Sequence, residues 1–197
     1  MYNLKKGLNI PISGSPEGTV SDSTKISHVG ILGPDYIGMK PTMMVEVGDQ
    51  VKIGSVLFED KKNPGVFFTS PAGGLIKSIN RGEKRRFISI EIEVADQENQ
   101  VEILNDSDEI LLRNLSKYGV INNFRTRPFN KTPKPNDIPN DIFVNICDTN
   151  PLSVDPYIYL QHEIDLFNRS LKKLKEIFNC NIHVCYQNND FNNFIDG

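Results

Sequence analysis

The sequence of 197 residues predicts a mixed α+β chain, in which an all-β domain over residues 1–100 precedes an α/β domain over residues 101–197. Two observations predict this division. Up to about residue 100, short apolar runs recur between turn-forming residues, a pattern typical of closely spaced strands. Beyond that point, longer segments carry apolar residues at spacings of three and four, as amphipathic helices do.

Composition excludes several functional classes. The chain is 38% hydrophobic and 24% charged, which supplies a core and argues against overall disorder. Its 22 basic and 25 acidic residues leave a net charge of -3, so no global positive field would attract nucleic acid. No apolar run approaches the ~20 residues that span a bilayer, and the first residues lack the apolar segment of a secretory signal. Three cysteines are few for a disulfide framework, so we expect a cytoplasmic protein.

In the all-β part, turn chemistry separates the apolar segments. Glycine, proline, asparagine and aspartate cluster between them, as at Gly48-Asp49 and Asn63-Pro64-Gly65. A polar loop over 15–25 is expected before a strand pair flanking Gly33. The spacing predicts further strands at 45–47, 51–53, 56–58, 66–68, 75–76 and 88–92.

The second part has the pattern of a βαβ unit. A helix over 106–119 and a proline-rich connector over 125–139 are predicted to precede it. A buried strand at 141–147 is then followed by a helix of about 24 residues, ~36 Å long, from the Asp155-Pro156 cap to Phe178, with Asn179 as its end. A second strand is predicted at 182–185. Because a helix connects them, the two strands should be parallel neighbours in one sheet.

Two segments of the all-β part resemble the halves of a biotinyl or lipoyl domain. Val47–Leu57 is similar to the V-G-D-x-V-x-x-G-x-x-L hairpin, and Ser70–Ile79 is similar to its partner. The resemblance implies a barrel-sandwich hybrid fold for residues 1–100. It also makes Lys61 or Lys62 a candidate carrier lysine near a hairpin tip. The biotin signature M-K-M and the lipoyl signature D-K-A are both missing, so we expect a solvated turn.

A second resemblance covers the whole chain and consists of seven motifs that occur in a fixed order. Together they resemble the A subunit of the sodium-translocating NADH:quinone oxidoreductase (Na+-NQR) of bacterial inner membranes. That protein is much longer, so the resemblance is to its amino-terminal part. The motifs are Lys5–Leu8, Gly33–Met39, Phe58–Gly65, Arg81–Arg85, Arg125–Phe129, Phe143–Asn145 with Asp148–Leu152, and Ile182–Cys185.

The resemblance implies a peripheral subunit on the cytoplasmic side of the inner membrane. The complex it implies oxidises NADH, reduces ubiquinone and exports sodium. In this chain we expect no catalytic residue, no metal ligand and no bound cofactor, and the isolated chain should have no activity. FAD, FMN, riboflavin and a 2Fe-2S cluster are expected on other subunits. The expected partners are those subunits, especially the membrane subunit with covalent flavin, and ubiquinone is the candidate ligand.

In such subunits two segments are regarded as lying near the quinone, and here they correspond to residues 32–39 and 125–131. Flat rings, a polarisable methionine and cations suited to a reduced carbonyl all occur there. The alternative is an ordinary interdomain seam with arginines paired to acids. The candidate quinone-proximal residues are Gly33, Tyr36, Gly38, Met39, Arg125, Arg127, Phe129 and Lys131.

Three further groups have competing structural explanations. Lys84-Arg85-Arg86 could attract a carboxylate or phosphate of a partner, or form a basic turn in water. Cys180, His183 and Cys185, with Cys147, offer soft ligands, but a buried strand is a poor place for zinc, so no metal site is predicted. Asp148–Leu152 lies where α/β sheets bind nucleotides but lacks the glycine fingerprint, so we expect a structural turn.

Two other functions remain compatible with the sequence. One is a homologue of the C subunit of Rnf-type electron-transport complexes, which would need flavin and cluster ligands that these residues do not supply. The other is a lipoyl-like or biotinyl-like carrier or scaffold module without a redox role, in which Lys61 or Lys62 would carry any modification.

Overall fold

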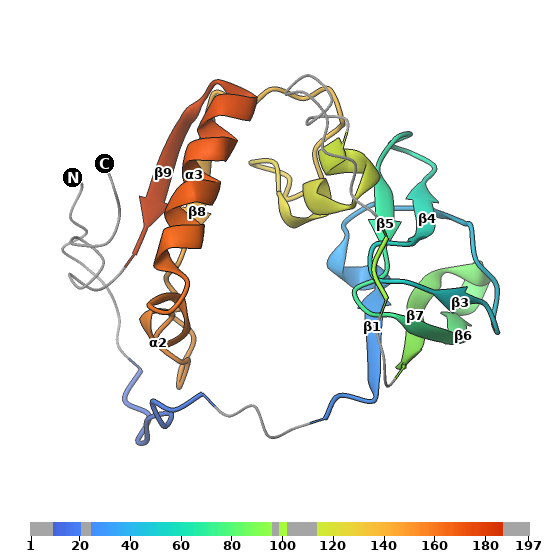
Figure 1. Ribbon diagram of the computed structural model, residues 1–197, viewed down its shortest axis with the longest axis horizontal. Coiled ribbons are helices and arrows are strands. Elements are labelled where there is room, and N and C mark those ends of the chain that lie inside the picture. The colour runs from blue at the N-terminus through green and yellow to red at the C-terminus, as the bar shows by residue number, and fades with distance from the viewer. Residues whose placement is uncertain (1–9, 21–24, 96–98, 102–113, 187–197) are drawn as a thin grey trace. The chain divides into compact units, whose positions relative to one another are not determined.

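The structure is a computed structural model that describes residues 10–20, 25–95, 99–101 and 114–186. It contains two compact units. The β unit spans residues 24–137, and the α/β unit combines the segment before residue 24 with the residues from 138 onward. Figure 1 shows the strands of the β unit and the helix-and-strand group of the α/β unit. The β unit thus includes residues 114–137, which the sequence pattern placed in the second domain.

Two antiparallel sheets build the β unit, and they confirm the predicted barrel-sandwich hybrid. One sheet has the strand order β1-β7-β6-β3 and the other has the order β2-β4-β5. Short 3₁₀ turns, η1 (Gly33–Asp35) and η2 (Glu83–Arg85), follow β1 and β6. The strands are β1 (His28–Leu32), β2 (Pro41–Met43), β3 (Gln50–Val51), β4 (Val56–Asp60), β5 (Phe67–Thr69), β6 (Gly74–Arg81) and β7 (Phe87–Val94).

Three phenylalanines at the centre of the β unit join its two sheets. Phe58 of β4 stacks on Phe68 of β5, with ring centroids 4.6 Å apart, and meets Phe87 of β7 at 5.2 Å. All three rings are buried, and in β4 the neighbouring residues Leu57 and Phe58 are both fully buried, next to a shift in register between β4 and β5. The core also contains Val51, Leu57, Val66, Ile76, Ile90, Ile92 and Ile121.

A glycine at the start of β6 permits the closest approach between strands. Gly74 pairs with Val94, and a Cβ at Gly74 would collide with the carbonyl of Glu93. The turn at Gly48 needs glycine for a different reason, because this residue has φ +99°, in the left-handed region. Glycine is therefore needed at these two predicted turns for two different reasons: the close approach of a neighbouring strand at Gly74, and a left-handed φ at Gly48.

The segment after residue 113 packs on the β unit rather than continuing as an independent element. Residues 114–117 are helical and Gly119, with φ +74°, ends the helix as predicted, whereas 102–113 lie outside the described residues. The 3₁₀ turn η3 (Val120–Asn123) follows and buries Ile121. No regular helix forms over 125–139, in agreement with its four prolines.

The α/β unit contains the predicted parallel strand pair. β8 (Asp141–Asn145) and β9 (Asn181–Cys185) run parallel, with Ile142 opposite Ile182. The last helix, α3 (Ile164–Phe178), packs against β9 and ends at Asn179, which has φ 46°. Asp155 accepts a hydrogen bond from the backbone N–H of Tyr157 at 2.9 Å, at the start of the helical region. Both predicted helix boundaries are confirmed.

Two predictions for this unit were wrong. The helix expected over 155–178 is divided into α2 (Tyr157–Leu160) and α3, because the intervening residues are polar and exposed and no packing holds them in one helix. The strand at 141–147 is not wholly buried. It alternates, with Ile142 buried and Phe143 66% exposed, as expected of a sheet covered mainly on one face.

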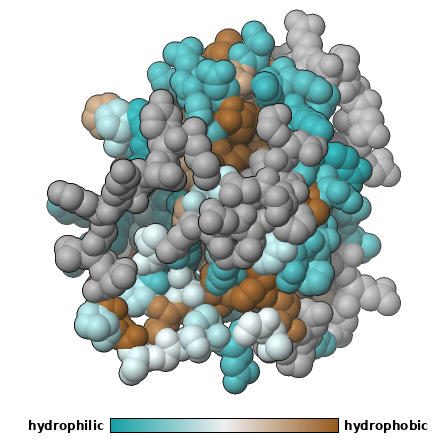
Figure 2. All heavy atoms as spheres, turned by 90° about the vertical axis from the view of Figure 1, so that its left-hand side faces the viewer, coloured by the Kyte–Doolittle hydropathy of each residue, from teal (hydrophilic) through white to brown (hydrophobic). Residues whose placement is uncertain are grey.

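Apolar side chains are distributed over the surface in separate patches. Figure 2 shows brown apolar areas between hydrophilic ones on the face that it presents. No helix within the described ranges is both long and apolar enough to cross a membrane.

Replacing the central ring should destabilise the β unit strongly. Phe58→Ala removes a fully buried side chain and both of its ring contacts, so the free energy of unfolding should fall by about 3–5 kcal/mol. Urea unfolding measures this change. Phe129→Ala is the matched control, because that ring is 70% exposed, and a loss below about 0.5 kcal/mol is expected. Equal losses in the two variants would contradict this account of the core.

Candidate functional site

An open pocket of about 360 Å³ lies on the β unit, between the end of β1, β5 and the segment around η3. Its size is within the range of small-molecule sites. Tyr36 lies on its wall, next to polar groups of β5 and η3. The lining residues are Gly30, Ile31, Leu32, Asp35, Tyr36, Phe68, Thr69, Ser70, Pro71, Tyr118, Gly119, Val120, Asn122 and Asn123.

The 3₁₀ turn η1 fixes Tyr36 at the pocket. β1 ends at Leu32, Pro34 occupies the start of the turn, and the N–H of Tyr36 donates to the carbonyl of Gly33 at 3.2 Å. A Cβ at Gly33 would lie 2.6 Å from the carbonyl oxygen of Phe87, so glycine allows the turn to approach β7. The ring of Tyr36 meets Phe68 edge to face, with centroids 4.6 Å apart. The core therefore holds this ring in place.

Arg125 lies next to the ring of Tyr36, although it is not itself among the residues that line the pocket. Its guanidinium carbon lies 5.1 Å from the ring centroid. One terminal nitrogen donates to the carbonyls of Phe124, at 2.9 Å, and Asn122, and the other donates to the carbonyl of Asp35 at 3.5 Å. These bonds hold a positive charge beside an aromatic face, and the carbonyl of Asp35 ties η1 to the loop after η3.

The wall opposite β1 depends on contacts that the sequence did not indicate. The side-chain amide of Asn122 donates to the carbonyl of Phe67 at 2.6 Å, and the hydroxyl of Thr69 donates to the carbonyl of Tyr118 at 3.2 Å. The Asn122 side-chain oxygen is buried without a hydrogen-bond partner. No local motif marks these residues, because each bond joins positions about fifty residues apart.

The eight candidate quinone-proximal residues fall into separate groups. Gly33, Tyr36 and Arg125 meet as described, and Met39 packs against the core while its N–H donates to the carbonyl of Tyr36 at 3.2 Å. Gly38 has φ +80° in the intervening turn. The other three are exposed on the 126–131 turn, where the ammonium of Lys131 lies 5.9 Å from the ring of Phe129. Of the eight candidates, only Tyr36 lines the pocket.

Two family models match the chain in sequence order. The model described as "NqrA N-terminal barrel-sandwich hybrid domain" matches residues 2–95, and the one described as "NqrA second alpha/beta domain" matches residues 106–196. The chain belongs to the NqrA family. The order of its β and α/β parts is the order of these two domains.

Curated relatives with close sequence similarity are named as the A subunit of Na(+)-translocating NADH-quinone reductase. The protein from Yersinia pseudotuberculosis serotype O:1b is 46% identical over 193 residues, which are 94% of this chain and 43% of the relative. The one from Neisseria meningitidis serogroup B is 47% identical over 192 residues, with the same two coverages. That from Pasteurella multocida is 44% identical over 192 residues. The chain therefore spans less than half the length of these relatives.

The two candidate carrier lysines of this NqrA-family chain lie in a tight turn between β4 and β5. Both Lys61 and Lys62 are exposed. The buried carboxylate of Asp60 accepts from the N–H groups of Lys40 and Lys62, both at 3.0 Å, and Glu59 accepts from Gly65 at 2.7 Å. These hydrogen bonds are those of a local turn with exposed lysines, and the expectation that neither lysine is modified stays a prediction.

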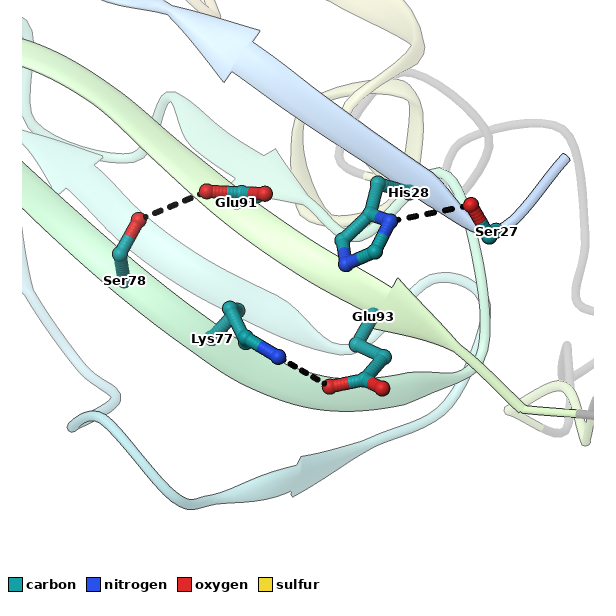
Figure 3. Close-up of polar contacts among 6 residues, drawn as sticks. All are labelled: Ser27, His28, Lys77, Ser78, Glu91 and Glu93. Carbon is teal, nitrogen blue, oxygen red and sulfur yellow. Dashed lines mark hydrogen bonds and ion pairs between the residues drawn. The ribbon is translucent and has the colours of Figure 1, made fainter.

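The outer face of the β1-β7-β6 sheet carries a ladder of polar side chains (Figure 3). Lys77 pairs with Glu93 at 2.9 Å, and the hydroxyl of Ser78 donates to Glu91 at 3.0 Å. The hydrogen bond from Lys77 holds the pKa of the Glu93 carboxyl below its ordinary value. These cross-strand pairs stabilise a solvated sheet face. Neither of the two pairs has the arrangement of a catalytic nucleophile and its base.

The three cysteines form no disulfide with one another, and the residues after β8 form a local turn. No group of three or more histidine, cysteine, aspartate or glutamate side chains suited to a metal occurs among the described residues, and His183 instead pairs with Asp141 at 2.8 Å. Asp148 accepts from the N–H of Asn150 at 2.9 Å, and Ser153 donates to the carbonyl of Asp148, which is the geometry of a local turn.

The Asp141–His183 pair should give the α/β unit a defined acid sensitivity. Its hydrogen bond holds the pKa of the Asp141 carboxyl below its ordinary value of 3.8. The stabilisation is thus complete above that value and is lost as pH falls through the lower folded-state pKa. In thermal unfolding measured at a series of pH values, Asp141→Asn should reduce the fall in melting temperature at acid pH. Asp148→Asn, which keeps its turn acceptor, should leave that fall unchanged, and an equal effect of both variants would contradict the assignment.

The three thiols should react in the order of their exposure. Cys185 is exposed, whereas burial raises the pKa of the Cys180 thiol, and burial also raises that of Cys147. A disulfide reagent at mildly alkaline pH should therefore modify Cys185 first and Cys180 last. Cys185→Ser should remove the fast phase of thiol modification, and Cys180→Ser should remove the slow phase. A fast phase of modification that survives Cys185→Ser would contradict this order.

Proposed function

We propose that this chain acts as the two-domain amino-terminal region of the A subunit of a sodium-translocating NADH:quinone reductase and forms part of its quinone-reduction site. The observation that carries the quinone assignment is the ring of Tyr36 in the lining of a pocket of about 360 Å³, with the guanidinium of Arg125 next to that ring. Membership of the NqrA family and the names of the relatives support the wider role.

The pocket has the chemistry that a quinone headgroup needs. Tyr36 places an aromatic ring in the pocket lining, and an aromatic contact with a ligand is worth about 0.5–1.5 kcal/mol beyond area burial. A quinone carbonyl gains negative charge as it is reduced, and the guanidinium of Arg125, 5.1 Å from the centroid of the Tyr36 ring, would supply positive charge next to this wall of the pocket. Three carbonyls already hold Arg125, so the charge is oriented before any ligand arrives.

Within the complex, the chain would be a peripheral subunit on the cytoplasmic side of the inner membrane, and it would bind no redox cofactor. FAD, FMN, riboflavin and the 2Fe-2S cluster would belong to other subunits, and the membrane subunit with covalent flavin would be its main partner. Electrons would reach the quinone from those subunits, and the isolated chain would bind quinone without reducing it.

Calorimetric titration with a water-soluble short-tail quinone tests the assignment. The chain should bind saturably, and Tyr36→Ala should weaken binding about tenfold, since a lost stacking contact is worth about 1.4 kcal/mol. Tyr36→Phe keeps the ring and should bind nearly as the original chain does.

Phe129→Ala is the matched comparison in this titration. Phe129 was predicted with Tyr36 but lies outside the pocket lining, so its loss should change affinity little. A loss of affinity confined to Phe129→Ala would move the quinone to the 126–131 turn. The absence of any binding heat would remove the quinone site from this chain.

A further inference from the structure

The tip of the β6–β7 hairpin concentrates positive charge in a chain of negative net charge. The basic tip consists of Arg81, Lys84, Arg85 and Arg86, and with Glu83 its four cations and one carboxylate give a local charge of +3, against -3 for the whole chain. Charges farther apart than about 8 Å are screened at physiological salt, so a nearby surface responds to the local value. The basic tip can therefore attract an anionic surface although the chain as a whole is acidic.

The hairpin closes on itself and leaves these side chains in solvent. Backbone hydrogen bonds join Gly82 to Arg86 at 2.8 Å and connect Arg85 to Gly82 at 3.1 Å. All four basic side chains are exposed, and within the described residues none forms an ion pair with a carboxylate. Arg81 donates to the carbonyl of Arg85, at 3.4 Å. The positive charge is thus available to a partner.

One exposed aliphatic side chain accompanies the basic tip. Ile88 follows it on β7, and its Cδ1 lies 3.1 Å from the position a Cβ would take on Gly82. Leu32, which is exposed at the end of β1, pairs with Ser89 and therefore projects from the opposite face of the sheet to Ile88. Cations beside an exposed aliphatic group suit a bilayer interface, where headgroups carry negative charge and the acyl boundary accepts apolar side chains. An acidic protein surface would use the charges but not this aliphatic group.

The basic tip and the pocket share one end of the β unit. Phe87 directly follows the tip, and its carbonyl oxygen lies 2.6 Å from the Cβ position of Gly33, the first residue of η1. Leu32, Asp35 and Tyr36, on either side of this contact, line the pocket. Asp35 is also exposed at this end, so the net positive charge there is reduced but not cancelled.

We propose that the basic tip binds the anionic lipid surface of the membrane and turns the pocket end of the β unit toward the bilayer. This inference rests on the proposed function, because a long-tailed quinone dissolves in the bilayer and must pass from it into the pocket. The basic tip would shorten that path by holding the Leu32–Tyr36 end of the pocket at the headgroups.

Vesicle co-sedimentation of the whole chain tests this orientation. The chain should sediment with vesicles of phosphatidylglycerol and phosphatidylcholine but not with phosphatidylcholine alone, and raised salt should release it. The triple variant K84Q/R85Q/R86Q should partition about a hundredfold more weakly, which is about 3 kcal/mol at about 1 kcal/mol per basic side chain. The control K52Q/K61Q/K62Q removes the same charge from exposed lysines of other turns and should bind as the original chain does.

Several results would overturn the proposal. These are no binding to anionic vesicles, equal weakening by both triple variants, or release by inorganic phosphate beyond that caused by chloride of equal ionic strength. Loss of the triple variant from the assembled complex without any vesicle binding would assign the tip to an acidic protein surface instead. Quinone titration of the same variants separates the two proposals, because K84Q/R85Q/R86Q should keep the quinone affinity of the isolated chain even if the membrane assignment fails.

Discussion

The contact of Phe58 with Phe68 and Phe87 is the interaction on which the β unit depends. These rings come from β4, β5 and β7, so they bridge both sheets. The same cluster reaches the pocket, because Tyr36 packs edge to face on Phe68 and Gly33 lies against Phe87. Burial of such rings is the dominant favourable term in a small domain. The pocket wall is therefore an extension of the core, which gives its aromatic ring a fixed position.

The fold could be predicted from the sequence where local chemistry decides it. Short apolar runs between turn-forming residues indicated the strands of the β unit, and Asp155 and Asn179 indicated helix boundaries. The break at 161–163 could not be predicted, because the apolar spacing continues across it and only packing distinguishes one helix from two. Likewise, the docking of residues 114–125 on β5 depends on hydrogen bonds between distant positions, such as that of Asn122 to Phe67.

The candidate site was predictable only in part. Family resemblance directed attention to Tyr36 and Arg125, but no local pattern joins them, since Arg125 and Asp35 lie 90 residues apart. Thr69, Tyr118 and Asn122 gave no signal at all, because their roles come from backbone carbonyls whose positions the fold sets. Phe129 shared the motif of Arg125, but only Arg125 lies next to Tyr36, whereas Phe129 is exposed, so proximity in sequence does not decide membership of a site.

Amide chemical-shift mapping of the isotope-labelled chain, with a water-soluble short-tail quinone, tests the central claim most directly. The account predicts saturable shifts around the pocket, at 30–36, 68–71 and 118–123, with no change in β8 and β9. Shifts confined to the 126–131 turn or to the α/β unit, or no shifts at all, would contradict it. The measurement locates the ligand without substitution of any residue, so a change in folding cannot be mistaken for a change in binding.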